Sequence, residues 1–167
     1  RRQRQMCIRD RRFTWWPQVF LGLAFNWGAL LAWAAHMGNV APAPVLAWLA
    51  GICWTIFYDT IYAHQDAEDD ALIGVKSTAR LFGRDSRRWL AGFGAGAVAL
   101  LVLAVLAARP DGLALLVALV GIAGFAAHLA WQLRRFDMDD PRGCLRLFRS
   151  NRDAGLLMAL GLSLIHI

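Results

Sequence analysis

Apolar residues run through this chain in five long blocks that shorter polar segments separate. The blocks cover residues 17–37, 43–65, 88–108, 112–133 and 145–165. Each is close to the ~20 residues that an α-helix needs to cross the hydrocarbon core of a bilayer. Pro17 opens the first block, where proline is well tolerated because its missing N–H would have no partner in the first helical turn. The pattern predicts an all-α, multi-pass transmembrane helical bundle with five membrane helices present.

Composition supports a membrane protein rather than a soluble domain. The 167 residues are 58% hydrophobic and only 18% charged, and the mean hydropathy is +0.42. The net charge of +6 does not indicate nucleic-acid binding, because the basic residues sort into loops instead of forming one patch. Cys7, Cys53 and Cys144 are scattered without the spacing of a zinc site or a disulfide framework.

Loop charge predicts how the helices are oriented. Six of the eighteen Lys and Arg residues precede the first block, five lie in residues 65–89 and six in residues 134–152. The short connections at 38–44 and 109–112 hold none and one. The positive-inside rule therefore places the N-terminal segment and the two long loops on the cytoplasmic side.

The second apolar block runs directly into a cluster of acids. The chain reads Ile56-Phe-Tyr-Asp-Thr-Ile-Tyr-Ala-His-Gln-Asp-Ala-Glu-Asp-Asp70, and a five-residue spacer then leads to Lys76-Ser-Thr-Ala-Arg80. If the helix continues, Asp59, Tyr62, Asp66 and Asp70 share one face, because they are three, four and four residues apart. Their repulsion, and the negative end of the helix dipole, favour a bound divalent cation in the working state.

The types of residue in this segment indicate a diphosphate site. Carboxylates such as Asp66, Asp69 and Asp70 are hard oxygen ligands that suit Mg²⁺, which also binds phosphate oxygens and water. Lys76 and Arg80 follow closely enough to neutralise a phosphate, and the adjoining helix offers an apolar cavity. A lipid diphosphate needs both. A solvated acidic loop is the plainer alternative. Likewise, Tyr58 and Tyr62 are either interfacial anchors or rings that stabilise a carbocation.

An ordered set of residues resembles the second aspartate motif of the UbiA superfamily of intramembrane aromatic prenyltransferases. The matching segments are Tyr58-Asp-Thr-x-Tyr-Ala63, Asp66-x-x-Asp-Asp70 and Ile73-Gly-x-Lys-Ser-Thr-Ala-x-Leu-Phe-Gly83. Flanking matches are Arg12-x-Thr-x-x-Pro-Gln-Val19 with Leu21-Gly22, and Cys144-x-x-x-Phe148-x-x-Asn151-x-x-x-Gly155. The resemblance covers about residues 12–162, and its length makes it far more specific than a bare pair of aspartates.

The resemblance implies roles for these residues. Family members have nine membrane helices, and this chain resembles helices five to nine. Asp66 and Asp70 would be the Mg²⁺-binding pair of the second motif, with Asp69 beside them. Lys76 would contact the diphosphate, and Asp59 and Tyr62 would line the pocket where acceptor and allylic carbon meet. The family's first motif, Asn-Asp-x-x-Asp-x-x-x-Asp, has no counterpart here, so we expect this chain alone to turn over little or nothing.

Within the superfamily, the closest resemblance is to the members that prenylate 4-hydroxybenzoate in ubiquinone biosynthesis. It implies that a polyprenyl group passes from polyprenyl diphosphate to the ring carbon ortho to the hydroxyl of 4-hydroxybenzoate. We therefore expect these two substrates and membrane lipid as partners, no nucleic acid, and a bacterial inner (plasma) membrane location. Three alternatives stay open: a superfamily member with another acceptor (a naphthoate, homogentisate, haem or a lipid glycerol), a cation-coupled transporter, and a non-catalytic assembly subunit.

The remaining predictions concern packing and the ends of the chain. Residues 12–162 are expected to be the C-terminal part of a single membrane prenyltransferase domain, residues 1–11 a loop or non-native sequence, and residues 163–167 a non-native end. The spacings Gly92-x-Gly-x-Gly96 and Gly121-x-x-Gly124 predict close helix–helix approach. Asn26, polar within the first block, is expected to hydrogen-bond to another helix. Arg146, Arg149 and Arg152 are interpreted as anchors near anionic lipid.

Overall fold

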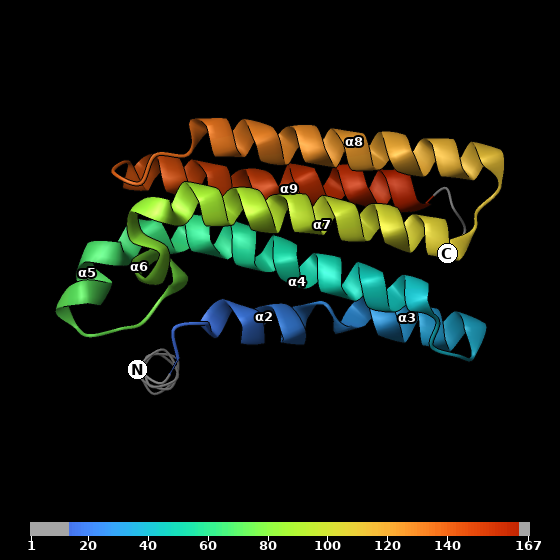
Figure 1. Cartoon of the computed structure of the whole chain (residues 1–167), viewed down its shortest axis with the longest axis horizontal. Coiled ribbons are helices and arrows are strands. Elements are labelled where there is room, and N and C mark those ends of the chain that lie inside the picture. Colours follow the sequence, from blue (N-terminus) through green and yellow to red (C-terminus); the bar gives the residue numbers. More distant parts are fainter. Residues whose placement is uncertain (1–13, 164–167) are drawn as a thin grey trace.

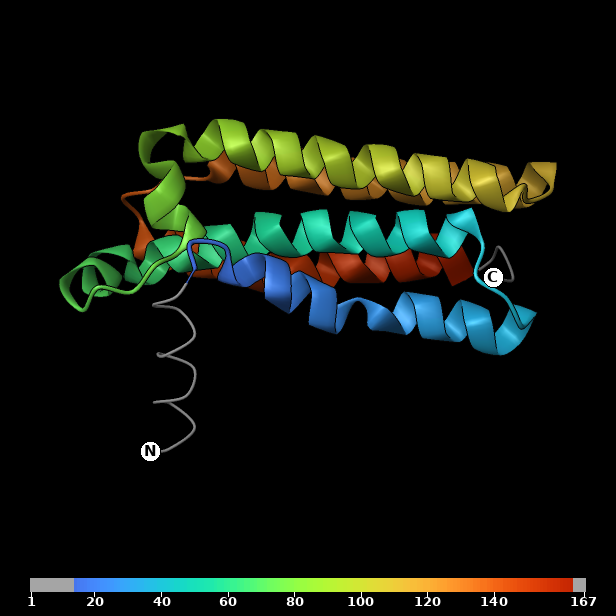
Figure 2. The ribbon, with the colours of Figure 1, turned by 60° about the horizontal axis from the view of Figure 1, so that its bottom comes forward.

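The described part of the computed structural model, residues 14–163, is built from helices, and its regular elements include no strand. In chain order they are α2 (Pro17–Phe25), α3 (Trp27–Met37), α4 (Pro42–Ala63), η1 (His64–Asp66), α5 (Ala67–Leu72), α6 (Thr78–Phe82), η2 (Gly83–Asp85), α7 (Ser86–Ala108), α8 (Gly112–Arg135) and α9 (Pro141–Ser163). The long helices lie side by side in one bundle (Figures 1 and 2). The all-α bundle is thus confirmed. The expectation for residues 1–11 falls outside the described residues, and so does that for residues 163–167 apart from Ser163, the last residue of α9.

The connections alternate between the two ends of the bundle as the loop charges predict. The α3–α4 and α7–α8 turns lie at one end, whereas α5, α6 and the α8–α9 loop lie at the other (Figure 1). The short turns are well defined by sequence: Gly38 closes α3 in the left-handed conformation, and the Asp111 carboxylate accepts a hydrogen bond from the Ala114 N–H at 2.8 Å. The acidic and basic loops therefore share one side.

Four helical stretches in the described residues are long and apolar enough to cross a membrane. They are Pro17–Met37, Pro42–Asp66, Thr78–Ala108 and Gly112–Arg135. The fifth predicted helix is present as α9, but Arg146, Arg149, Arg152 and Asp153 make its first half polar, and α9 is not among the four. The architecture is that of a multi-pass membrane protein.

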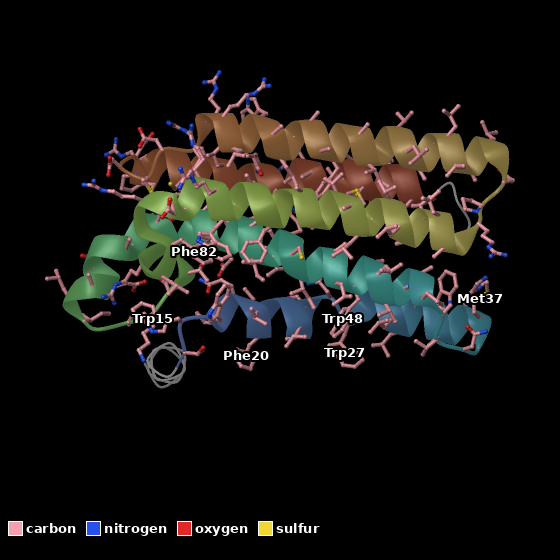
Figure 3. The ribbon with its side chains drawn as sticks, viewed as in Figure 1. Trp15, Phe20, Trp27, Met37, Trp48 and Phe82 are labelled. Carbon is pink, nitrogen blue, oxygen red and sulfur yellow. The ribbon has the colours of Figure 1, made fainter. Side chains whose placement is uncertain are left out.

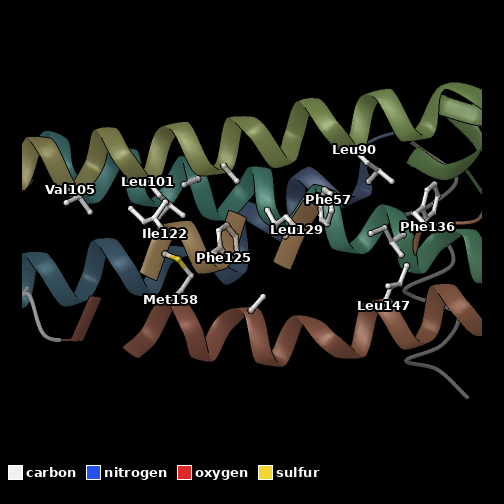
Figure 4. Packing of buried hydrophobic residues seen from close by; sticks show 14 of the residues in the cluster. Phe57, Leu90, Leu101, Val105, Ile122, Phe125, Leu129, Phe136, Leu147 and Met158 are labelled. Carbon is white, nitrogen blue, oxygen red and sulfur yellow. The ribbon is translucent and has the colours of Figure 1, made fainter. Parts of the chain in front are cut away.

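Helix α4 occupies the centre of the bundle and contacts α2, α3, α7 and α9. Its Phe57 and Ile61 are almost fully buried, in a core with Leu90 of α7 and Phe125 of α8 (Figure 4). Two of the predicted close approaches are confirmed. A Cβ on Gly94 would lie 3.4 Å from the Phe57 ring, and one on Gly121 only 2.8 Å from the Gly161 Cα. Gly92, by contrast, faces open space.

The first predicted helix is interrupted at Asn26, between α2 and α3. The Asn26 side-chain amide donates to the Gly22 carbonyl at 2.7 Å and to the Thr55 hydroxyl of α4 at 3.1 Å. This confirms the interhelical hydrogen bond. Gly51 of α4 provides the space, because a Cβ there would overlap the Asn26 amide. On the outer face of α2 and α3, Phe20 and Trp27 point away from the bundle (Figure 3).

Candidate active site

The helix that carries the acids changes geometry in the middle of the cluster. Helix α4 ends at Ala63, a 3-10 turn spans His64–Asp66, and the short helix α5 starts at Ala67. The condition for one shared face of Asp59, Tyr62, Asp66 and Asp70, an uninterrupted helix, is therefore not met. Like-charge repulsion between acids three and four residues apart disfavours one straight helix here. We call residues 64–77 the acidic turn.

The acidic turn reverses direction by a regular helix-ending motif. Gly74 is left-handed (φ +71°), the Val75 N–H donates to the Asp70 carbonyl at 2.9 Å, and the Gly74 N–H donates to the Ala71 carbonyl at 3.4 Å. The Arg80 guanidinium donates through Nη1 to the same Asp70 carbonyl at 3.3 Å, and also to the Val75 carbonyl. Arg80 thus holds the acidic turn against α6.

A buried polar cluster fixes the acidic turn to the bundle. The hydroxyls of Thr60 and Thr78 lie 2.6 Å apart, joining α4 to α6. The His64 ring contacts the Thr60 carbonyl through Nδ1 at 2.8 Å and the Ser86 hydroxyl of α7 through Nε2 at 3.1 Å. All four residues are buried. The side-chain polar groups of these four residues are thereby satisfied away from water, which makes this end of α4 a rigid platform.

The three aspartates of the acidic turn differ in exposure. Asp66 and Asp69 are exposed, whereas Asp70 is 8% exposed. Within the described residues no three His, Cys, Asp or Glu side chains converge as a metal site. The donor chemistry nevertheless fits Mg²⁺, because this ion commonly uses one or two protein carboxylates and completes its shell with phosphate oxygens and water. The metal roles of Asp66, Asp69 and Asp70 stay predictions.

The two cations predicted to bind diphosphate lie on the same side of α6. Lys76 Nζ and the Arg80 guanidinium carbon each lie 5.7 Å from the centre of the Trp15 ring. Trp15 therefore stacks against both cationic groups. Lys76 lies within the acidic turn and is half-buried, so part of it is open to solvent. An anion that reaches the acidic turn therefore meets positive charge there. Arg80 Nη1 already donates to the Asp70 and Val75 carbonyls. The role of Arg80 in diphosphate binding stays a prediction.

An aromatic pocket of about 390 Å³ lies between the α2–α3 break, α4 and α9. Its lining residues are Phe25, Asn26, Trp54, Thr55, Tyr58, Phe148, Arg149, Asn151 and Arg152. The rings of Trp54 and Tyr58 meet edge to face, with centroids 5.6 Å apart, and Tyr58 also contacts Phe148 at 5.8 Å. The Trp54 indole N–H donates to the Asn151 side-chain oxygen at 3.2 Å, which locks α4 against α9.

Two predicted site residues adjoin the aromatic pocket. The Tyr62 ring packs on Phe148 with centroids 4.6 Å apart. Asp59 is half-buried, and helical periodicity places it on the face of α4 that carries Thr55 and Tyr62. Tyr62 thus contacts one residue of the pocket, and Asp59 shares its helix face, whereas Asp66, Asp69, Asp70, Lys76 and Arg80 lie in and beside the acidic turn.

The pocket chemistry combines aromatic faces with positive charge. Electron-rich ring faces attract a cation such as an allylic carbocation, and the exposed Arg149 and Arg152 attract a carboxylate or phosphate at the rim. The sequence interpretation of these arginines as lipid anchors missed their place on the pocket. It also gave Trp54 no role, and placed Phe148 and Asn151 only as motif matches, because their meeting with α4 depends on tertiary packing.

Comparison with known proteins agrees with this architecture. The model of the UbiA prenyltransferase family matches residues 8–160. The chain is 49% identical over 155 residues to "4-hydroxybenzoate polyprenyltransferase, mitochondrial" of Mus musculus, covering 92% of this chain and 40% of that protein. For the proteins of the same name in Arabidopsis thaliana and Caenorhabditis elegans, identities are 46% and 44%, over 92% and 91% of this chain and 37% and 42% of theirs.

These matches cover only part of each relative. The chain spans about two fifths of the length of these curated relatives. Their names are mitochondrial, so the expectation of a bacterial inner membrane has no support among them, whereas the multi-pass membrane architecture stands. No solved structure matches the chain. The family match over most of the sequence, on a helical membrane bundle that carries the acidic turn, shows that the chain belongs to the UbiA prenyltransferase family.

Proposed function

We propose that this chain supplies the second-aspartate half of a prenyltransferase site that moves a polyprenyl group from polyprenyl diphosphate to 4-hydroxybenzoate. The observation that carries the proposal is that α9, which lines the aromatic pocket, also contacts the 3-10 turn His64–Asp66 of the acidic turn. The acidic turn suits a metal-bound diphosphate, and the aromatic pocket suits a carbocation and an aromatic ring. Tyr62 and Asp59 lie on the helix that joins the two. The names of the relatives support the same donor class and acceptor.

In the proposed reaction, Asp66 and Asp70 would hold Mg²⁺, which would stabilise the departing diphosphate, with Lys76 adding positive charge. The carbon–oxygen bond to the diphosphate breaks, and the allylic carbon becomes cationic beside the rings of Tyr58 and Tyr62. The ring carbon ortho to the hydroxyl then attacks and loses its proton to a base, a position that Asp59 suits. Arg149 or Arg152 holds the carboxylate of the acceptor.

The side on which this happens follows from the loop charges. The acidic turn lies at the same end as the α8–α9 loop, which arginines at the end of α8 and the start of α9 flank (Figure 1). We propose that this end faces the compartment that retains positive loops, the bacterial cytoplasm or the mitochondrial matrix. The acceptor and the diphosphate are polar and reach the site from that side, while the polyprenyl chain stays in the bilayer.

A chimaera tests the proposal without relying on this chain alone. The residues of the Mus musculus relative that match this chain are replaced by the chain, and transfer to 4-hydroxybenzoate is assayed in membranes. We expect Mg²⁺-dependent formation of a 3-polyprenyl product. A chimaera that inserts into the membrane but prenylates a naphthoate or homogentisate instead would assign another acceptor, and the absence of any transfer would contradict the proposal.

A further inference from the structure

A basic pocket lies where α7 begins and α8 ends, and it shares no lining residue with the aromatic pocket or the acidic turn. Its Phe136 ring does contact His64, the first residue of the acidic turn, with ring centroids 5.0 Å apart. Its volume is about 490 Å³, and its lining residues are Arg84, Arg87, Arg134, Arg135, Phe136, Asp137 and Met138. We call it the arginine pocket. Four guanidinium groups face one carboxylate there, and that of Asp137 accepts a local hydrogen bond from the Asp139 N–H at 3.0 Å. The pocket is therefore electropositive.

The arginines of the arginine pocket do not form ion pairs with the described carboxylates. Arg87 donates to the Phe136 carbonyl at 2.7 Å, which ties the start of α7 to the end of α8. Among the side chains that the structure describes, no carboxylate forms an ion pair with Arg84, Arg134 or Arg135, whereas neighbouring Arg88 is paired with Asp85 at 3.0 Å. Exposed like charges that outnumber the counter-charges beside them favour binding of an anion.

An apolar groove lies near the arginine pocket and is lined by residues of α7 and α8, with Phe57 of α4. It holds about 380 Å³ between α7 and α8, and it is lined by Phe57, Leu90, Ala91, Gly94, Ala95, Val98, Ala99, Ala126, Leu129, Ala130 and Leu133. We call it the acyl groove. Leu90 follows Arg87 by one turn of α7, and Leu133 adjoins Arg134 on α8. From Ala91 to Ala99 the groove extends roughly 12 Å along α7, a length that suits part of a hydrocarbon chain.

Two tryptophans mark the depth of the bilayer surface at this point. Trp89 of α7 is 48% exposed and Trp131 of α8 is 44% exposed, and each lies within one turn of the arginines of its own helix. Exposed tryptophans concentrate at the headgroup level of a membrane. The arginine pocket thus lies where lipid phosphates lie, and the acyl groove lies in the hydrocarbon.

We propose that the arginine pocket and the acyl groove together bind one anionic glycerophospholipid, with its phosphate among the arginines and one acyl chain between α7 and α8. Charge complementarity selects an anionic headgroup, because basic pockets between membrane helices on the positive side of a membrane protein suit such lipids. The groove selects a lipid over a free phosphate. This site is separate from the proposed diphosphate site and does not depend on it.

Native mass spectrometry of the purified chain in detergent tests the proposal. The chain is titrated with dioleoyl-phosphatidylglycerol, dioleoyl-phosphatidylcholine and glycerol phosphate. We expect phosphatidylglycerol to bind more tightly than phosphatidylcholine. The double variant Arg84→Gln, Arg134→Gln should weaken phosphatidylglycerol binding by about thirtyfold. The control Arg88→Gln, Arg142→Gln removes the same charge at the same end of the bundle, outside the pocket, and should leave binding within about twofold.

A second pair of variants examines the groove. The pair Ala95→Leu and Ala130→Leu fills the groove from two exposed positions that line it. The control pair Ala123→Leu and Ala127→Leu adds the same bulk at two exposed positions of α8 that do not line the groove. Only the first pair should lower lipid binding. Equal binding of both lipids, equal loss in pocket and control variants, or glycerol phosphate that binds as tightly as the lipid regardless of groove filling would each overturn the proposal.

Discussion

At the scale of single residues, the site depends on side chains that hold the acidic turn in place. The hydroxyls of Thr60 and Thr78 are fully buried and lie 2.6 Å apart. Replacing either one by valine leaves the other without this partner, at a cost of about 1–3 kcal/mol in the free energy of unfolding. Replacing both removes the unsatisfied group, so the double variant should be closer to wild type than the two single losses predict. Thermal unfolding of the wild type, the two single variants and the double variant in detergent measures these stabilities. Strictly additive losses of stability would contradict the hydrogen bond.

Cys144 gives a second residue-scale prediction. Burial raises the pKa of its thiol to about 11, and the nearby Asp140 and Asp137 carboxylates contribute to the rise. The thiolate is the reactive form, so it becomes abundant only when the pH rises through that value. Maleimide should therefore label Cys144 slowly at pH 8 in the folded chain and rapidly after unfolding in dodecyl sulfate. Equally fast labelling of both states, in a variant with Cys7 and Cys53 replaced by serine, would show that the thiol is accessible.

The sequence pattern identified the polar residues of the site, but it did not predict which residues they contact. Asp66, Asp70 and Lys76 carry chemistry in their side chains and in an ordered motif. Trp54 and Asn151 are joined by a hydrogen bond although 97 positions separate them, and no local pattern encodes that contact. His64 likewise gains its role from Ser86 of α7, which packs against it only in the folded bundle.

At the scale of helices, the apolar blocks predicted the long elements well because membrane helices need long uninterrupted apolar segments. The two departures have polar causes. Asn26 turns its amide back onto the Gly22 carbonyl and breaks the first helix, and the acids of the turn end α4 early. In the first case a side chain competes with the helix backbone for hydrogen bonds, and in the second case like-charged side chains repel one another. Hydropathy measures neither effect.

The crossing of α8 and α9 provides a prediction at this scale. Gly121 and Gly161 approach so closely that a side chain at Gly121 must push the helices apart. Gly121→Val should lower the free energy of unfolding by about 1–3 kcal/mol through overpacking. Gly92→Val introduces the same side chain into a helix where Gly92 faces open space, and it serves as the matched control. Similar unfolding temperatures for the two variants would contradict the close crossing.

At the scale of the whole molecule, the alternation of loops fixes which ends share a side of the membrane. Val40 and Leu72 are both highly exposed and lie in connections at opposite ends of the bundle. Single cysteines at these two positions, in a background whose native cysteines are serine, should react with an impermeant maleimide from opposite sides of sealed vesicles. Labelling of both from one side would contradict the multi-pass arrangement.

The site as a whole joins two regions that the sequence placed only partly. The acidic motif indicated the diphosphate region, whereas the aromatic pocket required the packing of α4, α9 and the α2–α3 break. Its two arginines come from α9, whose charged first half the sequence interpreted as lipid contact. The tertiary arrangement therefore supplies the acceptor side of the proposed reaction.

The central claim is that the carboxylates of the acidic turn hold the metal-bound diphosphate, and the most direct test is their replacement in the active chimaera. Asp66→Asn and Asp70→Asn should each lower Mg²⁺-dependent prenyl transfer by at least about a hundredfold while membrane insertion is unchanged. Asp139→Asn, an exposed aspartate at the same end of the bundle, should keep wild-type activity. Near-normal transfer by either turn variant, at any Mg²⁺ concentration, would contradict the account.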